Sequence, residues 1–130
     1  MKATVLIVDD DATLRGALDS VLTPAGYRVV TAASAETGYE RLASEPADAV
    51  LIDVHLPTMS GLALSVAMVA RWPELEGRIA FMTADPEAAE VCSWLRHHHC
   101  TVFSKPFGLR QIPKWLGNVL RARHRSVRSG

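Results

Sequence analysis

The chain has 130 residues, the size of one ordinary globular domain with a single core. Of these residues, 48% are apolar and 22% are charged, a composition that excludes wholesale disorder and a membrane span. The 14 basic and 14 acidic residues cancel, but the body of the chain is acidic, because no acidic residue follows Leu109 and six basic ones do: Arg110, Lys114, Arg121, Arg123, Arg125 and Arg128.

Five short apolar runs rich in β-branched residues alternate with longer segments of helical period. This alternation predicts a parallel sheet with helices on both faces. The predicted strands are residues 4–8, 28–31, 49–52, 78–83 and 101–104. The first and third runs are almost entirely apolar, as expected of strands that are buried on both faces.

Three helices are predicted within the first half of the chain and just beyond it. The first has an apolar stripe at the spacing i, i+4, i+7 and i+8, formed by Leu14, Leu18, Val21 and Leu22. Pro24 with Gly26 ends it. Ser34 is expected to cap the second helix, which reaches residue 43, although Thr37 at its N3 position lacks the side chain of a full capping box. Ser60 is expected to cap the third, which ends near residue 71.

The fourth helix is expected to start at Pro86, with Asp85 as its N-cap. Its predicted inward stripe is formed by Ala88, Val91, Cys92 and Leu95. The fifth helix has Pro113 in its first turn. Its predicted inward stripe is formed by Ile112, Leu116, Val119 and Leu120. Residues 1–121 are therefore expected to form one domain, and residues 122–130, which lack apolar periodicity, a basic and mobile C-terminal tail.

Polar residues follow four of the five predicted strands. Three aspartates, residues 9–11, follow the first, Asp53 follows the third, Thr83 ends the fourth and Lys105 follows the fifth. In an open parallel sheet, ligands bind at the carboxyl ends of the strands. We therefore expect these side chains to form one compact charged site.

A group of carboxylates requires a counter-charge, since two of them about 4 Å apart repel by roughly 4 kcal/mol at an effective dielectric constant near 20. Oxygen ligands without a histidine or cysteine partner suit a hard cation, and an open site that keeps water and phosphate oxygens suits Mg²⁺. Lys105 and Thr83 would then hold phosphoryl oxygens. The pattern predicts a magnesium-assisted phosphoryl-transfer site with a carboxylate nucleophile.

Four segments of the chain carry a recognisable pattern: Val8-Asp9-Asp10-Asp11, the run Asp53-Val54-His55-Leu56-Pro57-Thr58-Met59-Ser60-Gly61, Thr83-Ala84 and Lys105-Pro106-Phe107. Together they resemble the receiver domain of two-component response regulators. Each segment alone is a weak signal. All four occur in order and at strand ends, over residues 3 to about 120, which makes the resemblance specific.

The resemblance implies a metal site and a phosphorylation site in one place. Asp53 resembles the phosphoacceptor, which attacks the phosphoryl group of a phosphohistidine to give an acyl phosphate. Asp10 resembles the direct Mg²⁺ ligand and Asp9 a neighbour that acts mainly through water, with Asp53 and the backbone carbonyl of His55 as the other protein ligands.

Lys105 and Thr83 resemble the residues that contact the transferred phosphate. A phosphate on Asp53 would give Thr83 a new acceptor and shift the packing of the fourth helix and fifth strand. Members of the family usually carry an aromatic residue three positions before the lysine, where this chain has Val102, with Phe103 on the opposite side of the strand. The departure concerns the aromatic switch and not the phosphorylation chemistry.

We predict an α/β fold of the flavodoxin-like kind, in which five helices cover a five-stranded parallel sheet of strand order 2-1-3-4-5. The resemblance also implies a cis peptide bond between Lys105 and Pro106. Cys92 and Cys100 match no zinc or redox spacing, and no signal peptide precedes the first apolar run, so a reducing, cytoplasmic location is expected.

Four features have both a structural and a functional interpretation. The histidine run 97–99 is expected to suit a helix C-terminus, since consecutive residues on a helix cannot all reach one ion. Trp94 is placed off the inward stripe of the fourth helix and Trp115 at the edge of that of the fifth, so both either pack beside the core, the commoner case, or form a partner surface. His55 either tunes loss of the phosphoryl group or is merely exposed.

Three functions other than a phosphorylated receiver are possible for a chain with this pattern. Residues 9–13 also fit the opening motif of haloacid-dehalogenase-like phosphatases, with Asp9 as nucleophile, but no acidic residue follows Lys105 to complete that site and Asp53 stays unexplained. An FMN-binding flavodoxin-like module would need an uncharged, hydroxyl-rich loop after the first strand. A receiver that serves only as a phosphorylation-independent docking surface is the third alternative.

The sequence thus predicts a phosphoacceptor receiver in a two-component phosphorelay, catalysing only its own phosphorylation and dephosphorylation. Its expected partners are a sensor histidine kinase or histidine phosphotransfer protein and a downstream protein, with a homodimer through the fourth helix, fifth strand and fifth helix as a further option. No membrane and no direct nucleic-acid contact are expected. No output domain follows, so the domain either signals through intermolecular contacts, as single-domain receivers do, or is part of a longer protein.

Overall fold

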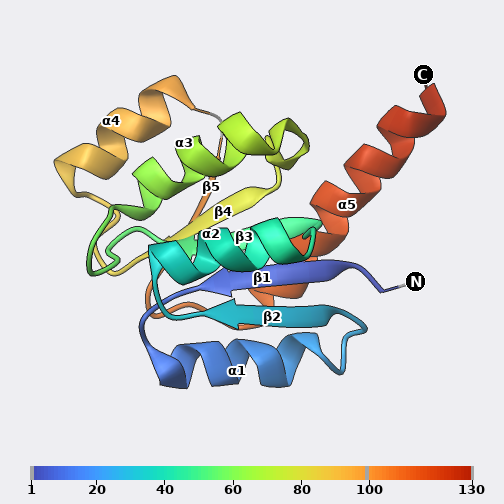
Figure 1. Cartoon of the computed structure of the whole chain (residues 1–130), viewed down its shortest axis with the longest axis horizontal. Coiled ribbons are helices and arrows are strands. Elements are labelled where there is room, and N and C mark those ends of the chain that lie inside the picture. Colours follow the sequence, from blue (N-terminus) through green and yellow to red (C-terminus); the bar gives the residue numbers. More distant parts are fainter. Residues whose placement is uncertain (1, 99, 130) are drawn as a thin grey trace.

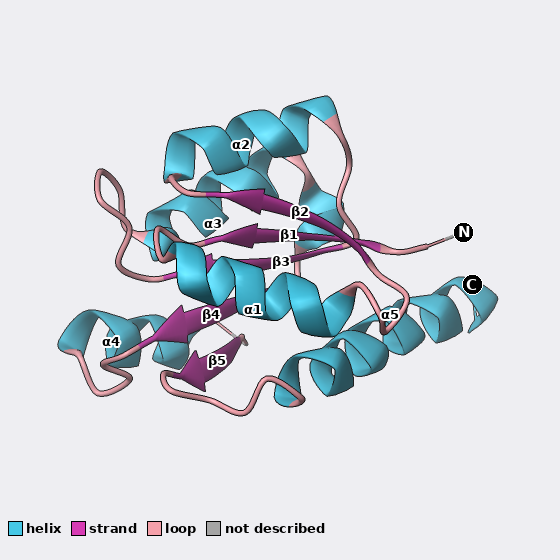
Figure 2. Ribbon diagram, turned by 90° about the horizontal axis from the view of Figure 1, so that it is seen from below, coloured by secondary structure: helices cyan, strands magenta, loops and turns pink. Residues whose placement is uncertain are grey.

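The structure is a computed structural model that describes residues 2–98 and 100–129, with side chains described up to residue 121. One sheet has the strand order β2-β1-β3-β4-β5. Its strands are β1 (Thr4–Val8), β2 (Arg28–Ala32), β3 (Ala49–Asp53), β4 (Ile79–Thr83) and β5 (Thr101–Ser104). All neighbouring pairs are parallel, and the five arrowheads point toward the same edge of the sheet (Figure 2). The predicted fold and strand order are confirmed.

Helices cover both faces of this sheet (Figure 1). They are α1 (Ala12–Leu22), α2 (Ala35–Ser44), α3 (Gly61–Arg71), α4 (Ala89–His97) and α5 (Gln111–Ser129), with a 3-10 turn, η1 (Pro73–Leu75), after α3. Alternate side chains of β1 enter two separate cores: Val5 and Ile7 pack with α1 and α5, whereas Leu6 and Val8 pack with α2, α3 and α4. The strand is apolar throughout because both of its faces are buried.

Three helix starts are fixed by side-chain caps that satisfy free backbone N–H groups. Ser34 Oγ accepts a hydrogen bond from the Thr37 N–H at 3.1 Å, and Ser60 Oγ accepts one from the Leu62 N–H at 3.1 Å, as predicted. Asp11 caps α1, which the sequence analysis did not identify. Pro113 lies in the first turn of α5, as predicted.

The predicted start of α4 is wrong. The helix begins at Ala89, and Ala88 is an N-cap without a side-chain hydrogen bond. The reason is a turn in which the Ala88 N–H donates to the carbonyl of Asp85 at 3.2 Å, with Pro86 inside it, a position that suits the fixed φ of proline. The Asp85 carbonyl therefore accepts a hydrogen bond within the turn, and α4 starts after this turn.

The predicted inward stripe of α4 is also partly wrong. Val91 is buried, but Leu95 is 41% exposed. Trp94, placed off the stripe by the sequence pattern, packs edge-on against Phe81 of β4 with ring centroids 6.1 Å apart. The large indole of Trp94 therefore covers β4 in place of Leu95.

Trp115 of α5 is 9% exposed and packs edge-on against Phe103, with ring centroids 6.3 Å apart. It therefore belongs to the core, and the partner-surface interpretation is wrong for this tryptophan. The backbone of residues 122–129, predicted as a tail, continues α5 as helix, and the division between domain and tail stays a prediction. Among the described residues, no helix is both long and apolar enough to cross a membrane.

Candidate functional site

The acidic residues after β1 and β3 come together at the carboxyl edge of the sheet. Val8 and Ile52 are register partners in β1 and β3, so Asp9 and Asp53, each one residue further along, are neighbours across the two strands. Both are buried, whereas Asp10 is exposed. The nearest carboxylate oxygens of Asp9, Asp10 and Asp53 all lie within 4.8 Å of one another. We refer to these three residues as the acidic cluster.

Lys105, which directly follows β5, supplies a positive charge to this cluster. Its Nζ donates to Asp9 Oδ2 at 2.9 Å and to Asp53 Oδ2 at 3.2 Å. Its backbone N–H donates to the carbonyl of Thr83 at 2.7 Å, which ties the lysine to the end of β4. The Lys105–Pro106 peptide bond is cis, as the resemblance implies.

Backbone amides hold the second oxygen of each buried carboxylate. Asp9 Oδ1 accepts a hydrogen bond from the Asp11 N–H at 2.8 Å, and Asp53 Oδ1 accepts one from the His55 N–H at 3.0 Å. Asp10, by contrast, has no side-chain hydrogen bond within the described part of the chain. The two buried aspartates are therefore fixed in place, and the third keeps its oxygens open to solvent.

The proximity of these groups perturbs their ionisation. Burial raises the pKa of Asp53, and the Asp9 carboxylate adds to this, while the His55 amide and Lys105 oppose it. Partial burial alone would lower the pKa of Lys105, but the hydrogen bonds and negative charges of Asp9 and Asp53 outweigh it and raise this pKa. The lysine is thus held as a cation, and Asp53 is less easily ionised than an ordinary aspartate.

Thr83 and His55 lie at the margins of the cluster. Thr83 ends β4 beside β3, is buried, and its hydroxyl oxygen accepts the Asp85 N–H at 3.0 Å. The His55 ring is half exposed, with Nδ1 3.8 Å from Glu90 Oε1 in the first turn of α4. Glu90 is not predicted by the sequence pattern, because only the packing of α4 brings it to the loop after β3.

The oxygen-rich donor set fits a hard divalent cation. Three carboxylates converge, with no histidine or cysteine among them, and such donors suit Mg²⁺ rather than a softer metal. Among the residues whose side chains are described, 2–98 and 100–121, no other group of three or more potential ligands of these types comes together. The rings of His97 and His98 instead contact the carbonyls of Ser93 and Trp94 through Nδ1, consistent with the predicted helix C-terminus, and His99 lies outside the described residues.

The family model of the response regulator receiver domain matches residues 5–116. The chain belongs to the receiver domain family. The interval covers the five strands except Thr4, the first residue of β1, and it includes every residue of the acidic cluster as well as Thr83 and Lys105. The haloacid-dehalogenase alternative finds no support, since the family match and the sheet order both assign the chain to the receiver fold.

Named relatives agree with this assignment. The receiver protein CpdR of Brucella abortus is 31% identical over 118 residues, which cover 91% of this chain and 97% of CpdR. The response regulator FleR of Pseudomonas aeruginosa is 34% identical over 112 residues, but the match spans 86% of this chain and only 23% of FleR. A CheY-like receiver from Methanospirillum hungatei has the same fold, with a TM-score of 0.87, 23% identity and coverage of 97% and 99% of the two chains.

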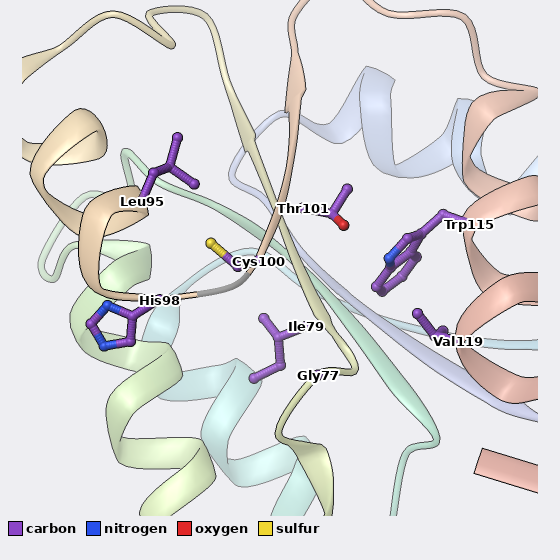
Figure 3. Close-up of a pocket in the computed structure, with 8 residues that line it drawn as sticks. All are labelled: Gly77, Ile79, Leu95, His98, Cys100, Thr101, Trp115 and Val119. Atoms are coloured by element: carbon purple, nitrogen blue, oxygen red, sulfur yellow. The ribbon is translucent and has the colours of Figure 1, made fainter. Parts of the chain in front are cut away.

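Two further features lie at β5. Val102 packs toward the core under α2, α3 and α4, and Phe103 toward the core under α1 and α5, so they lie on opposite sides of the strand as predicted. A hollow of about 420 Å³ lies at the opposite, amino end of β4 and β5, between α4 and α5 (Figure 3). It is lined by Gly77, Ile79, Leu95, His98, Cys100, Thr101, Trp115 and Val119, and none of these belongs to the acidic cluster.

Proposed function

We propose that this receiver domain accepts a phosphoryl group on Asp53 from the phosphohistidine of a sensor histidine kinase or a histidine phosphotransfer protein. The observation that supports the proposal is the bridge from Lys105 Nζ to both Asp9 and Asp53 inside the acidic cluster. A buried aspartate beside two further carboxylates and one fixed ammonium is suited to receive and hold a phosphoryl group.

In the proposed transfer, a carboxylate oxygen of Asp53 bonds to phosphorus as the bond from phosphorus to the histidine nitrogen breaks. The His55 N–H holds Oδ1 of Asp53 and so fixes the plane of the attacking carboxylate. Lys105 already contacts Oδ2 and would bind a phosphoryl oxygen after transfer. The same groups would serve when water removes the phosphoryl group, and no other reaction is assigned to the domain.

Mg²⁺ is the proposed cofactor, held by Asp9, Asp10, Asp53 and the backbone carbonyl of His55. Bound there, Mg²⁺ neutralises charge on the phosphoryl oxygens. Because Lys105 contacts Asp9 Oδ2 and an amide contacts Oδ1, Asp9 is better placed to act through water than Asp10, whose oxygens are open.

Thr83 connects the site to α4. Its hydroxyl oxygen accepts the Asp85 N–H, so its own hydrogen remains for donation to a phosphoryl oxygen. Asp85 in turn accepts the Ala88 N–H immediately before α4 begins. Movement of Thr83 toward a phosphate would therefore pull on the turn that precedes α4 and change the α4 surface seen by partners.

The proposed partners bind two different surfaces of the domain. A hollow of about 350 Å³ lies beside Lys105, next to the cluster, and its walls include Asp11, Leu14 and Phe107. We propose that the donor protein contacts the domain at this hollow. A downstream protein, or a second copy of the chain, would bind the face formed by α4, β5 and α5. A cytoplasmic location is part of this proposal, because histidine kinases transfer their phosphoryl group to receivers in the cytoplasm.

His55 is proposed to tune loss of the phosphoryl group, since its ring stands at the mouth of the site beside Glu90. The lifetime of the acyl phosphate in His55→Ala, compared with wild type, measures this role. An unchanged lifetime would leave His55 merely exposed.

The decisive experiment is intact-protein mass spectrometry after incubation with acetyl phosphate and Mg²⁺. Wild type should gain one phosphoryl group and Asp53→Asn none, while Asp11→Asn, which changes the charge of the same edge by one, should be labelled. Labelling retained in Asp53→Asn but lost in Asp9→Asn would instead indicate the phosphatase chemistry. No labelling of wild type would indicate a docking module that works without phosphorylation.

A further inference from the structure

Arg15 in the first turns of α1 reaches back to the loop that carries the acidic cluster. Its Nη1 donates to the backbone carbonyl of Asp9 at 2.7 Å, in a partly buried position. The backbone N–H of Arg15 donates to the carbonyl of Asp11, the N-cap of the same helix. The side chain thus spans the whole turn between β1 and α1.

The contact completes the set of hydrogen bonds around Asp9. The Asp9 N–H donates to the carbonyl of Ala32 in β2 at 3.1 Å, and its two carboxylate oxygens accept from Asp11 and Lys105. The carbonyl is the remaining polar atom of this buried residue, and Arg15 is the group that satisfies it. A buried carbonyl without a hydrogen bond would destabilise the folded state, so the contact with the Arg15 guanidinium stabilises it.

Of the three aspartates in the cluster, Asp10 depends most on the backbone contact of Arg15 for the direction of its carboxylate. Its carboxylate has no hydrogen bond within the described residues, so its direction depends on the backbone that carries it. On one side that backbone is the Asp9–Asp10 peptide group, held by Arg15, and on the other it is Asp11, held as the cap of α1. Without Arg15, one of these two supports is lost.

We propose that Arg15 is a positioning residue for the divalent cation. It clamps the peptide group between Asp9 and Asp10, which keeps the open carboxylate of Asp10 within reach of those of Asp9 and Asp53. The proposal rests on the proposed magnesium function of the cluster. Arg15 itself contacts the backbone of Asp9 and none of the carboxylate oxygens of the acidic cluster.

The charge of Arg15 and its hydrogen bond to Asp9 predict opposite effects on Mg²⁺ binding when the residue is replaced. The guanidinium is always positive, so by charge alone it opposes a divalent cation, and its removal should tighten Mg²⁺ binding. By position it supports the ligands, and its removal should weaken binding. Outer contacts that orient metal ligands typically contribute about 10- to 100-fold to metal affinity. Since Arg15 supports one of three carboxylates, we expect about tenfold weaker binding in Arg15→Met.

The test is isothermal titration calorimetry of the whole chain with MgCl₂, for wild type, Arg15→Met, Arg15→Lys and Arg121→Met. Arg121 is a matched control, because its Nε donates to the backbone carbonyl of Gly117 in α5, far along the chain from the cluster. We expect Arg15→Met to weaken Mg²⁺ binding about tenfold, Arg15→Lys to weaken it less, and Arg121→Met to leave it unchanged. Arg15→Lys also serves as the second variant if Arg15→Met does not fold.

Amide hydrogen exchange without metal gives a second readout, which measures whether Arg15 holds this loop before any cation binds. The Asp11 N–H, bonded to Asp9, should exchange faster in Arg15→Met than in wild type at equal global stability. Equal or tighter Mg²⁺ binding in Arg15→Met would overturn the assignment of Arg15 alone. A wild-type protein that binds no Mg²⁺ would refute the proposed function and the role of Arg15 together.

Discussion

Replacing Asp53 by asparagine should stabilise the metal-free protein, although it removes the proposed phosphoacceptor. Asp53 is 5% exposed and lies beside Asp9 and Asp10. Burial and the charge of Asp9 raise its pKa, which means that the folded state resists the charge that the unfolded chain carries freely. Asparagine keeps the oxygen that accepts the His55 N–H and removes the charge.

The magnitude follows from the distances. With the carboxylate oxygens at most 4.8 Å apart and an effective dielectric constant of 20, each carboxylate pair repels by at least about 3.5 kcal/mol. The contact of Lys105 Nζ with Asp53 at 3.2 Å contributes about 5 kcal/mol of attraction on the same scale. The two repulsions that Asn removes exceed this attraction by about 2 kcal/mol, and solvent screening of the exposed Asp10 lowers the gain to about 1–2 kcal/mol. This corresponds to a rise of roughly 5 °C in melting temperature for a domain of this size.

Thermal unfolding followed by circular dichroism in EDTA measures the effect across a pH series. Because the folded pKa of Asp53 lies above its ordinary value of 3.8, wild type loses stability as the pH rises from that value through the folded pKa. The Asn variant lacks this loss, so its advantage should vanish in acid and grow as the pH rises through the folded pKa of Asp53. Asp11→Asn, which removes a charge nearby and keeps an N-cap, should change stability by only a few tenths of a kcal/mol. An Asp53→Asn protein that melts no higher than wild type at neutral pH would refute the reasoning.

Three further predictions concern the metal, the loop and α4. Millimolar Mg²⁺ should raise the melting temperature of wild type and EDTA should reverse this, because ligand binding stabilises the folded state; no shift would count against the metal site. Gly61→Ala should cost about 1–3 kcal/mol in urea unfolding, since its Cβ would overlap the Asp53 carbonyl oxygen, whereas Gly16→Ala, with open space, should gain up to about 1 kcal/mol. Trp94→Ala should cost about 2 kcal/mol and Leu95→Ala under about 0.5 kcal/mol; a larger loss in Leu95→Ala than in Trp94→Ala would favour the stripe predicted from sequence.

Local patterns in the sequence were sufficient for most of the fold. The apolar runs located every strand to within one residue, and Ser34 and Ser60 marked two helix starts, because strand burial and N-capping depend on neighbouring residues. The gathering of Asp9, Asp53 and Lys105 followed from the strand ends, since parallel strands bring their carboxyl ends to one edge.

Contacts between distant segments were decided only by the tertiary structure. The helical wheel of α4 placed Leu95 inward and Trp94 outward, but packing on Phe81 set the opposite order. The pairing of His55 with Glu90 and the bonding pattern of Lys105 with both aspartates depend on how α4 and β5 lie against β3. Residue spacing along the chain determines which side chains share a face, whereas distances of about 3 Å between side chains depend on how whole elements pack, and this is why the sequence predicted the members of the site but not their contacts.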